Sequence, residues 1–267
     1  MTIEQWEDTS GVTHTATNQV YILDSNFSMW NYLPRTRRIW IYLPRSYSTD
    51  VNRTYPVLYA HDGQNLFDRA TSFSGEWQMD ESLDRLSKNL IVVGIDNGGA
   101  ERINELTPYP NPEYGGGQAD EYLAFIVDKL RPFINLHFRT KIDRDNTAIL
   151  GSSLGGLCSY YAALKYEDIF GLIGVFSPSF WFTDDIFQLT EKFRFQQSPP
   201  RIYFLGGQAE SQTMVSDMQR MIKILKNTTE EYRTDPNRLI LSVKADGQHS
   251  EWFWGREFPY AIEWLFP

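Results

Sequence analysis

The chain has 267 residues, of which 42% are hydrophobic and 22% charged, and this composition is typical of a folded globular protein with a well-buried core. A formal net charge of −9, with no large cluster of Lys and Arg, argues against a nucleic-acid partner. The lack of a signal-peptide pattern and of any apolar stretch near the ~20 residues of a membrane span, together with a single cysteine, predicts a cytoplasmic protein without an internal disulfide.

The first third of the chain reads mainly as strands. Runs at 20–23 and 38–43 predict two early strands, which we expect to form an antiparallel edge. Apolar runs at 55–60 and 90–95 predict two more strands, with a helix between them around 79–88.

A segment rich in Gly, Pro, Asn and Tyr follows at 97–118, and we expect a long loop there. Loops of this length are often functional or mobile, and a surface excursion without a role is an equally open interpretation. Helical spacing then extends from 120 to 135, with Pro132 near its end or kinking it.

The second half alternates strands with helices. The expected strands are 146–150, 172–176, 201–205 and 238–243, and the expected helices are 157–165, 214–226 and 251–266. This alternation predicts parallel βαβ units, and hence a three-layer α/β/α sandwich with a mostly parallel central sheet and antiparallel N-terminal edge strands. No linker or repeat divides the chain, so we expect one domain over residues 1–267.

The most informative motif is G-x-S-x-G at 151–155, with Ser153 at its centre. It lies between a predicted buried strand and a predicted apolar helix, where the motif turns the chain sharply and exposes the serine hydroxyl. A glycine-rich turn that only packs a helix on a sheet is the alternative interpretation.

A serine nucleophile needs a base, and the chain offers four histidines. His249 directly follows the last predicted strand, at the carboxyl edge of the sheet where Ser153 also emerges. We expect His14 and His137 to be surface residues and His61 to fix its loop by hydrogen bonding.

The third member should be an acid between the serine and the histidine in the sequence. Glu210 lies just past the strand that ends near 205, and we favour it over Asp246, which is close enough to His249 to shape the turn instead. Asp184 and Asp185 are a weaker third option.

Two backbone amides should stabilise the oxyanion. One would come from Leu154, and the second from the loop after the third strand, where Gly63 is our choice and Gln64 is nearly as good.

Four motifs in this order resemble the putative esterase family of α/β-hydrolases, which includes esterase D, feruloyl, acetyl-xylan and enterochelin-type esterases. They are His61–Asp68, Gly151–Gly156, Ser177–Trp181 and the closing His249. The resemblance implies the α/β-hydrolase fold and a serine carboxylesterase with Ser153, Glu210 and His249 as triad and no metal or organic cofactor. The aromatic residues expected to line its substrate pocket are Trp181, Phe180, Tyr109 and Tyr114.

The leading hypothesis is hydrolysis of a small acyl or carbohydrate-linked ester through an acyl-enzyme. A siderophore trilactone esterase, an acyltransferase of the same fold, and a non-catalytic homologue that binds a ligand are the alternatives. The spacing of His, Cys and carboxylate residues predicts no metal site. The only expected partner is a small-molecule ester, with neither nucleic acid nor membrane, and the oligomeric state stays open, with a homodimer among the alternatives.

Overall fold

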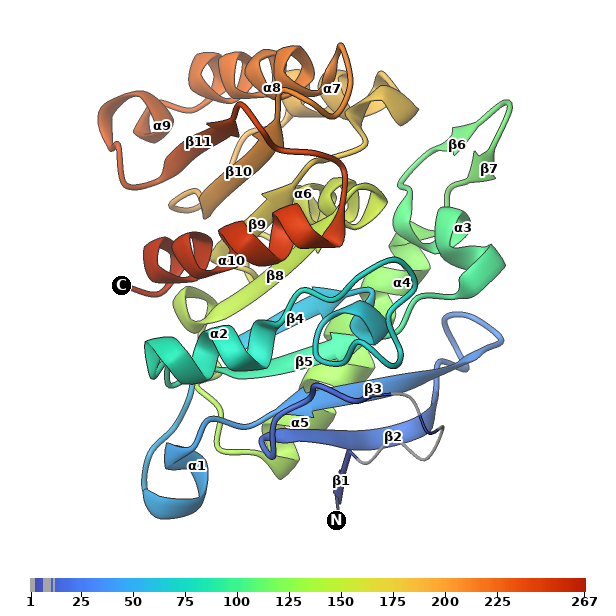
Figure 1. Ribbon diagram of the computed structural model, residues 1–267. Helices are drawn as coiled ribbons and strands as arrows, with labels where there is room; N and C mark the ends of the chain where they lie inside the picture. Colours follow the sequence, from blue (N-terminus) through green and yellow to red (C-terminus); the bar gives the residue numbers. More distant parts are fainter. Residues whose placement is uncertain (1–2, 7–10, 12) are drawn as a thin grey trace.

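The computed structural model describes residues 3–6, 11 and 13–267. Its centre is a sheet with the strand order β1-β2-β3-β5-β4-β8-β9-β10-β11 (Figure 1). The strands are β1 Glu4–Gln5, β2 Val20–Ser28, β3 Thr36–Tyr42, β4 Val57–His61, β5 Ile91–Ile95, β8 Thr147–Ser152, β9 Leu172–Phe176, β10 Arg201–Gly207 and β11 Leu239–Lys244. From β5 to β11 neighbouring strands are parallel, whereas β1, β2 and β3 form an antiparallel edge, as the sequence predicts.

Helices cover both faces of this sheet. They are α1 Ser46–Thr49, α2 Met79–Leu86, α3 Arg102–Leu106, α4 Ala119–Phe125, α5 Arg131–His137, α6 Leu154–Lys165, α7 Asp185–Lys192, α8 Met214–Thr228, α9 Glu231–Thr234 and α10 Glu251–Leu265. Alternate residues of one strand belong to different cores: Val57 and Tyr59 to the core that includes residues of α4, α5, α6 and α8, and Leu58 and Ala60 to the core that includes residues of α2 and α10. The α/β/α sandwich is therefore confirmed.

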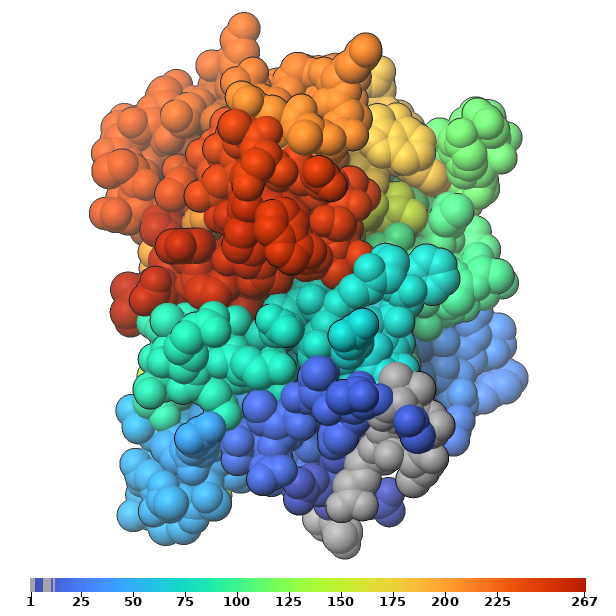
Figure 2. All heavy atoms as spheres, in the orientation of Figure 1, coloured from blue at the N-terminus to red at the C-terminus, as the bar shows by residue number. Residues whose placement is uncertain are grey.

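The helix α10 lies across the middle of the sheet face that α2 also covers. In the space-filling view it meets α2 and the segment that precedes α2 (Figure 2). None of the helices in the described part of the chain combines the length and the apolar character that a membrane crossing requires.

Two segments differ from the sequence expectation. The expected loop at 97–118 contains α3 and a small hairpin of β6 (Pro110–Asn111) and β7 (Gly115–Gly116). The expected helix at 120–135 is α4 and α5 joined by a π-helical turn, η3 (Ile126–Leu130). Pro132 lies in the first turn of α5, directly after η3, where its missing N–H removes fewer helical hydrogen bonds than it would in a helix interior.

The carboxyl ends of the parallel strands bring distant parts of the sequence together. The strands β4, β5, β8, β9, β10 and β11 all end at this edge, because their registers run in parallel. Ligands in open α/β sheets bind at this edge. The loops that follow these strands therefore carry the candidate site.

Candidate active site

Ser153 connects β8 to α6 in a strained backbone conformation. Its φ of 58° and ψ of −121° lie in a region that residues with a side chain rarely adopt. The turn is held from both sides, because the Ser153 N–H donates to the Phe176 carbonyl at 3.0 Å and the Ser153 carbonyl accepts the Ser179 N–H at 3.0 Å. A Cβ on Gly151 would lie 2.7 Å from the carbonyl carbon of Gly155, so the motif glycine permits this close approach.

The Ser153 side chain lies on a cavity of about 280 Å³ that His249 also lines. Among the described residues, the hydrogen-bond partner of Ser153 Oγ is Ser179 Oγ, at 3.2 Å. Ser153 thus lies on the same cavity as the imidazole that the sequence predicts as its base.

His249 is oriented by Glu210. The imidazole Nδ1 lies 2.6 Å from Glu210 Oε2, and the Glu210 side chain is 1% exposed while that of His249 is 40% exposed. The other carboxylate oxygen, Oε1, accepts hydrogen bonds from Ser177 Oγ at 2.8 Å and from the Gly207 N–H at 2.6 Å. The acid is therefore buried and fully hydrogen-bonded, with the histidine between it and the cavity.

A tryptophan on α10 supports this pair. Trp254 Nε1 donates to Ser177 Oγ at 2.8 Å, and the Trp254 ring meets the His249 ring edge-on at 5.0 Å between centroids. The hydroxyl of Ser177 consequently links the indole of Trp254 to the carboxylate of Glu210.

The competing acids lie in other ion pairs. Asp246 bonds to Arg256 at 2.5 Å on the surface, and Asp184 bonds to Arg220 at 2.7 Å. Of the weighed carboxylates, the structure brings Glu210 into contact with His249.

The predicted oxyanion amides lie at two turns. Leu154 is the first residue of α6, so its N–H has no acceptor within the helix. Gln64 lines the cavity, and its position is fixed because its side-chain Oε1 accepts the Asn97 N–H at 3.1 Å and its carbonyl accepts Thr71 Oγ1 at 2.7 Å. Gly63 lies behind it, where a Cβ would come within 2.8 Å of the Ile95 nitrogen.

His61 is buried beside this turn. Its Nδ1 lies 3.0 Å from the Tyr122 hydroxyl, and burial lowers the pKa of His61 to about 4. It stays neutral near pH 7 and acts as a structural residue.

His14 and His137 are both exposed. His14 lies 3.1 Å from an Asp68 oxygen, and His137 lies 2.8 Å from the Phe133 carbonyl.

The four expected aromatic lining residues lie outside this cavity. Phe180 is 1% exposed and packs in the core against Tyr160, because its 3-10 turn directs the ring inward. Trp181 is 57% exposed and contacts Tyr114 edge-on at the β6–β7 hairpin, and Tyr109 contacts Tyr161. The aromatic residues of the lining are Phe73 and Trp254 instead.

Sequence reasoning missed the charged residues of the cavity. Arg102 on α3 holds Asp62 by two bonds, Nε to Oδ1 at 2.6 Å and Nη2 to Oδ2 at 2.8 Å, and Asn97 Nδ2 donates to Oδ1 at 2.7 Å. Burial acts to raise the pKa of Asp62, but Arg102 and Asn97 outweigh burial and hold that pKa below its usual value. Glu251, two residues after His249, accepts Ser74 Oγ at 2.8 Å on the same cavity.

Comparison with known proteins identifies the group to which this chain belongs. The family model described as "Putative esterase" matches residues 31–261. The chain belongs to this esterase family. It is a carboxylic ester hydrolase, as the resemblance implies.

The sequence relatives of this esterase differ in how much of it they match. The uncharacterized protein YbbA of Bacillus subtilis is 28% identical over 86% of this chain and 92% of its own length. A siderophore enterobactin esterase of Emericella nidulans is 38% identical, but over only 32% of this chain and 28% of its own length.

Solved structures show the same fold. The enterobactin esterase FES from Shigella flexneri aligns with a TM-score of 0.72 at 19% identity, over 96% of this chain and 59% of that one. The siderophore hydrolase EstB from Aspergillus nidulans aligns with a TM-score of 0.71 at 19% identity, over 92% of this chain and 96% of that one. At these identities the likeness establishes the α/β-hydrolase architecture of the esterase. It does not identify the substrate, which we infer from the residues that line the cavity.

Proposed function

We propose that the esterase cleaves its substrate through an acyl-enzyme on Ser153, with His249 as base and Glu210 as acid. The observation that carries the proposal is the 2.6 Å contact between His249 Nδ1 and the buried Glu210, at the cavity that Ser153 lines. An ionised carboxylate can only accept a hydrogen bond, so Nδ1 bears the proton and Nε2 keeps a lone pair for the serine hydroxyl.

The reaction begins when Ser153 Oγ attacks the ester carbonyl carbon and its proton passes to His249 Nε2. Ser153 Oγ is hydrogen-bonded to Ser179 Oγ before the substrate binds, so the Ser153 side chain must first rotate toward His249. Breakdown of the tetrahedral intermediate breaks the bond to the alcohol oxygen, which takes the proton back from His249. Water then attacks the acyl-enzyme with His249 again as base.

The oxyanion would be held by two backbone N–H groups, those of Leu154 and Gln64. The Leu154 N–H, at the start of α6, has no acceptor within that helix, and Gln64 lines the cavity on a turn fixed at both its side chain and its carbonyl. Gly63, whose Cα packs against β5, is the alternative second donor.

The cavity favours a small, polar ester. Its volume is about 280 Å³, and the lining includes Arg102, Asn97 and Glu251 as well as the reacting groups. A short acyl group or a hydroxylated alcohol such as a sugar would fit this lining, and we infer a small acyl or carbohydrate-linked ester as substrate. A siderophore trilactone is the second candidate, because relatives carry that activity in their names. Most of such a substrate would lie outside the cavity.

The test is hydrolysis by the purified chain of p-nitrophenyl acetate, a feruloyl sugar and a catecholate trilactone. Ser153→Ala should abolish release of the alcohol from every substrate that the parent cleaves. Equal activity of parent and variant would contradict the mechanism. A parent protein that binds these esters without cleaving them would support the binding-protein alternative, and transfer of the acyl group to added glycerol would support the acyltransferase.

A further inference from the structure

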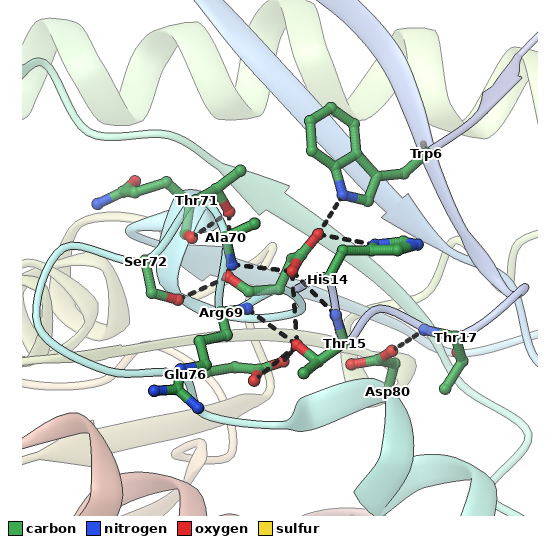
Figure 3. Close-up of polar contacts among 12 residues, drawn as sticks. Trp6, His14, Thr15, Thr17, Arg69, Ala70, Thr71, Ser72, Glu76 and Asp80 are labelled. Atoms are coloured by element: carbon green, nitrogen blue, oxygen red, sulfur yellow. Dashed lines mark hydrogen bonds and ion pairs between the residues drawn. The ribbon is translucent and has the colours of Figure 1, made fainter. Parts of the chain in front are cut away.

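Three carboxylates gather away from the candidate active site, where the loop from β4 enters α2. Glu76 lies three residues before α2, and Asp80 and Glu81 are in its first turn. One oxygen of each carboxylate lies within 4.8 Å of the others. The N-terminal segment covers them: Thr15 Oγ1 donates to Glu76 at 2.9 Å, and the Thr17 N–H donates to Asp80 Oδ2 at 2.7 Å (Figure 3).

The hydrogen-bond donors around these carboxylates leave some of the carboxylate oxygens without a partner. Asp80 is 0% exposed, yet its Oδ1 has no hydrogen-bond partner in the described part of the chain. Glu81 Oε2 and Thr17 Oγ1 are also buried atoms without a hydrogen-bond partner in that part of the chain. A buried carboxylate oxygen without a donor costs free energy, so a proton or a cation must be supplied to it.

The neighbouring Asp68 shows what a satisfied buried carboxylate looks like in this region. Its oxygens accept the Trp6 indole N–H at 2.5 Å, the Thr15 N–H at 3.1 Å and the Ala70 N–H at 2.9 Å. Burial acts to raise the pKa of Asp68, but these bonds outweigh it and lower that pKa. Asp80 lacks such a donor set.

Charge is also unbalanced at the three carboxylates. None of the ion pairs formed among residues 3–6, 11 and 13–267 includes Glu76, Asp80 or Glu81. A bound cation would offset the negative charge that these carboxylates bring together.

We propose that Glu76, Asp80 and Glu81 bind a divalent cation, and that this cation is Ca²⁺. All three offer hard carboxylate oxygens, and the unpartnered hydroxyl of Thr17 is a further oxygen next to Asp80. One oxygen of each carboxylate lies within 4.8 Å of the others, so a single Ca²⁺ with ligand distances of about 2.3–2.6 Å could contact all three. The flexible coordination of Ca²⁺ also tolerates ligands from a loop and a helix better than the octahedral geometry that Mg²⁺ demands.

Such a cation would fix one wall of the substrate cavity. Gln64, Asn65, Phe73 and Ser74 of the loop before α2 all line that cavity, and Glu76 lies two residues after Ser74. The Asn65 carbonyl accepts the Trp77 N–H at 2.9 Å, which ties the two ends of the loop together. Binding at Glu76 would join this loop to α2.

The experiment measures thermal unfolding of the full chain after treatment with EDTA, with and without CaCl₂. At a hundredfold excess of Ca²⁺ over Kd, we expect Tm to rise by about 5–10 °C. Asp80→Asn should abolish this rise, and Glu81→Gln should weaken Ca²⁺ binding at least about tenfold. The matched control is Glu121→Gln, because Glu121 is the third residue of α4 as Glu81 is of α2, and it is exposed. The Tm of Glu121→Gln should rise with CaCl₂ as much as that of the parent does.

The proposal is overturned if about 10 mM CaCl₂, a concentration above the Kd of weak protein sites, leaves the parent Tm unchanged. It is also overturned if Asp80→Asn responds as the parent does, or if MgCl₂ or MnCl₂ shifts Tm and CaCl₂ does not. A shared proton in place of a cation predicts a different pattern, in which Asp80→Asn raises Tm and no cation changes that of the parent. Should Asp80→Asn fail to fold, the comparison of Glu81→Gln with Glu121→Gln decides. None of these measurements depends on ester hydrolysis.

Discussion

Single residues at the cavity differ sharply in what surrounds them, and this difference sets the expected effect of substitution. Glu210 has a donor for each oxygen and contacts His249, whereas Asp246 is on the surface with Arg256. Glu210→Gln should lower kcat on the order of 10³- to 10⁴-fold, because an amide no longer stabilises the charged imidazole or fixes its tautomer. Asp246→Asn should leave kcat within about twofold, and steady-state kinetics on a short acyl ester measures both. A larger loss of kcat for Asp246→Asn than for Glu210→Gln would identify Asp246 as the triad acid instead.

Arg102 is a second residue whose partner is buried. Replacing it with Met would leave the Asp62 carboxylate without its guanidinium, and we expect the free energy of unfolding to fall by about 3 kcal/mol. The double variant Asp62→Asn/Arg102→Met should recover part of the loss, since it removes the unpaired charge. Urea denaturation of the parent and the variants measures this. A double variant no more stable than Arg102→Met would contradict this expectation.

His61 gives a dependence of stability on pH. Its pKa is lowered by burial to about 4 in the folded chain, against about 6.5 when unfolded. The unfolded state therefore binds more protons between these values, so this contribution is complete above pH 6.5 and is lost as pH falls toward 4. Between pH 7 and pH 4 the parent should lose on the order of 3 kcal/mol more than His61→Gln, which cannot take up the proton. Parallel pH profiles in denaturant titrations would contradict this.

At the scale of elements, the junction of β8 and α6 leaves little room for an added side-chain carbon. A Cβ on Gly151 would lie 2.7 Å from both the Gly155 carbonyl carbon and His61 Cδ2, so Gly151→Ala should cost about 1–3 kcal/mol and displace Ser153. Gly155→Ala is the milder comparison, because its Cβ comes no nearer than 3.3 Å to His61 Cβ. Thermal unfolding and ester hydrolysis should rank the two in this order.

The elements also show what sequence can reveal. Strands and helices with strong periodicity were predictable. So was the position of Ser153 and His249 on one cavity, with Glu210 in contact with His249, because the carboxyl ends of parallel strands share one edge of the sheet. The ion pair of Asp62 with Arg102 joins the turn after β4 to α3, two segments that no local pattern relates. The direction of Phe180 into the core likewise depends on neighbours from other helices. The grouping of Glu76, Asp80 and Glu81 was not predicted, because the burial of Asp80 and its contact with the N-terminal segment depend on the fold.

At the scale of the molecule, the net charge of −9 acts on every substrate that approaches the cavity. Long-range repulsion should slow the capture of an anionic ester, and salt should relieve it because the Debye length falls from about 30 Å at 0.01 M to about 8 Å at 0.15 M. We expect kcat/KM for an anionic ester to rise over this range while that of a neutral ester of the same size stays constant. An equal salt response of the two esters would contradict steering by net charge.

The edge-on contact of Trp254 with His249 gives the molecule an optical signal of its own. Trp254 also lines the cavity, so a ligand that enters the cavity changes the surroundings of its indole. The fluorescence that Trp254 contributes, obtained as the difference between the parent and Trp254→Phe, should therefore change when a ligand binds. Occupancy of the cavity could then be followed even when no ester is cleaved.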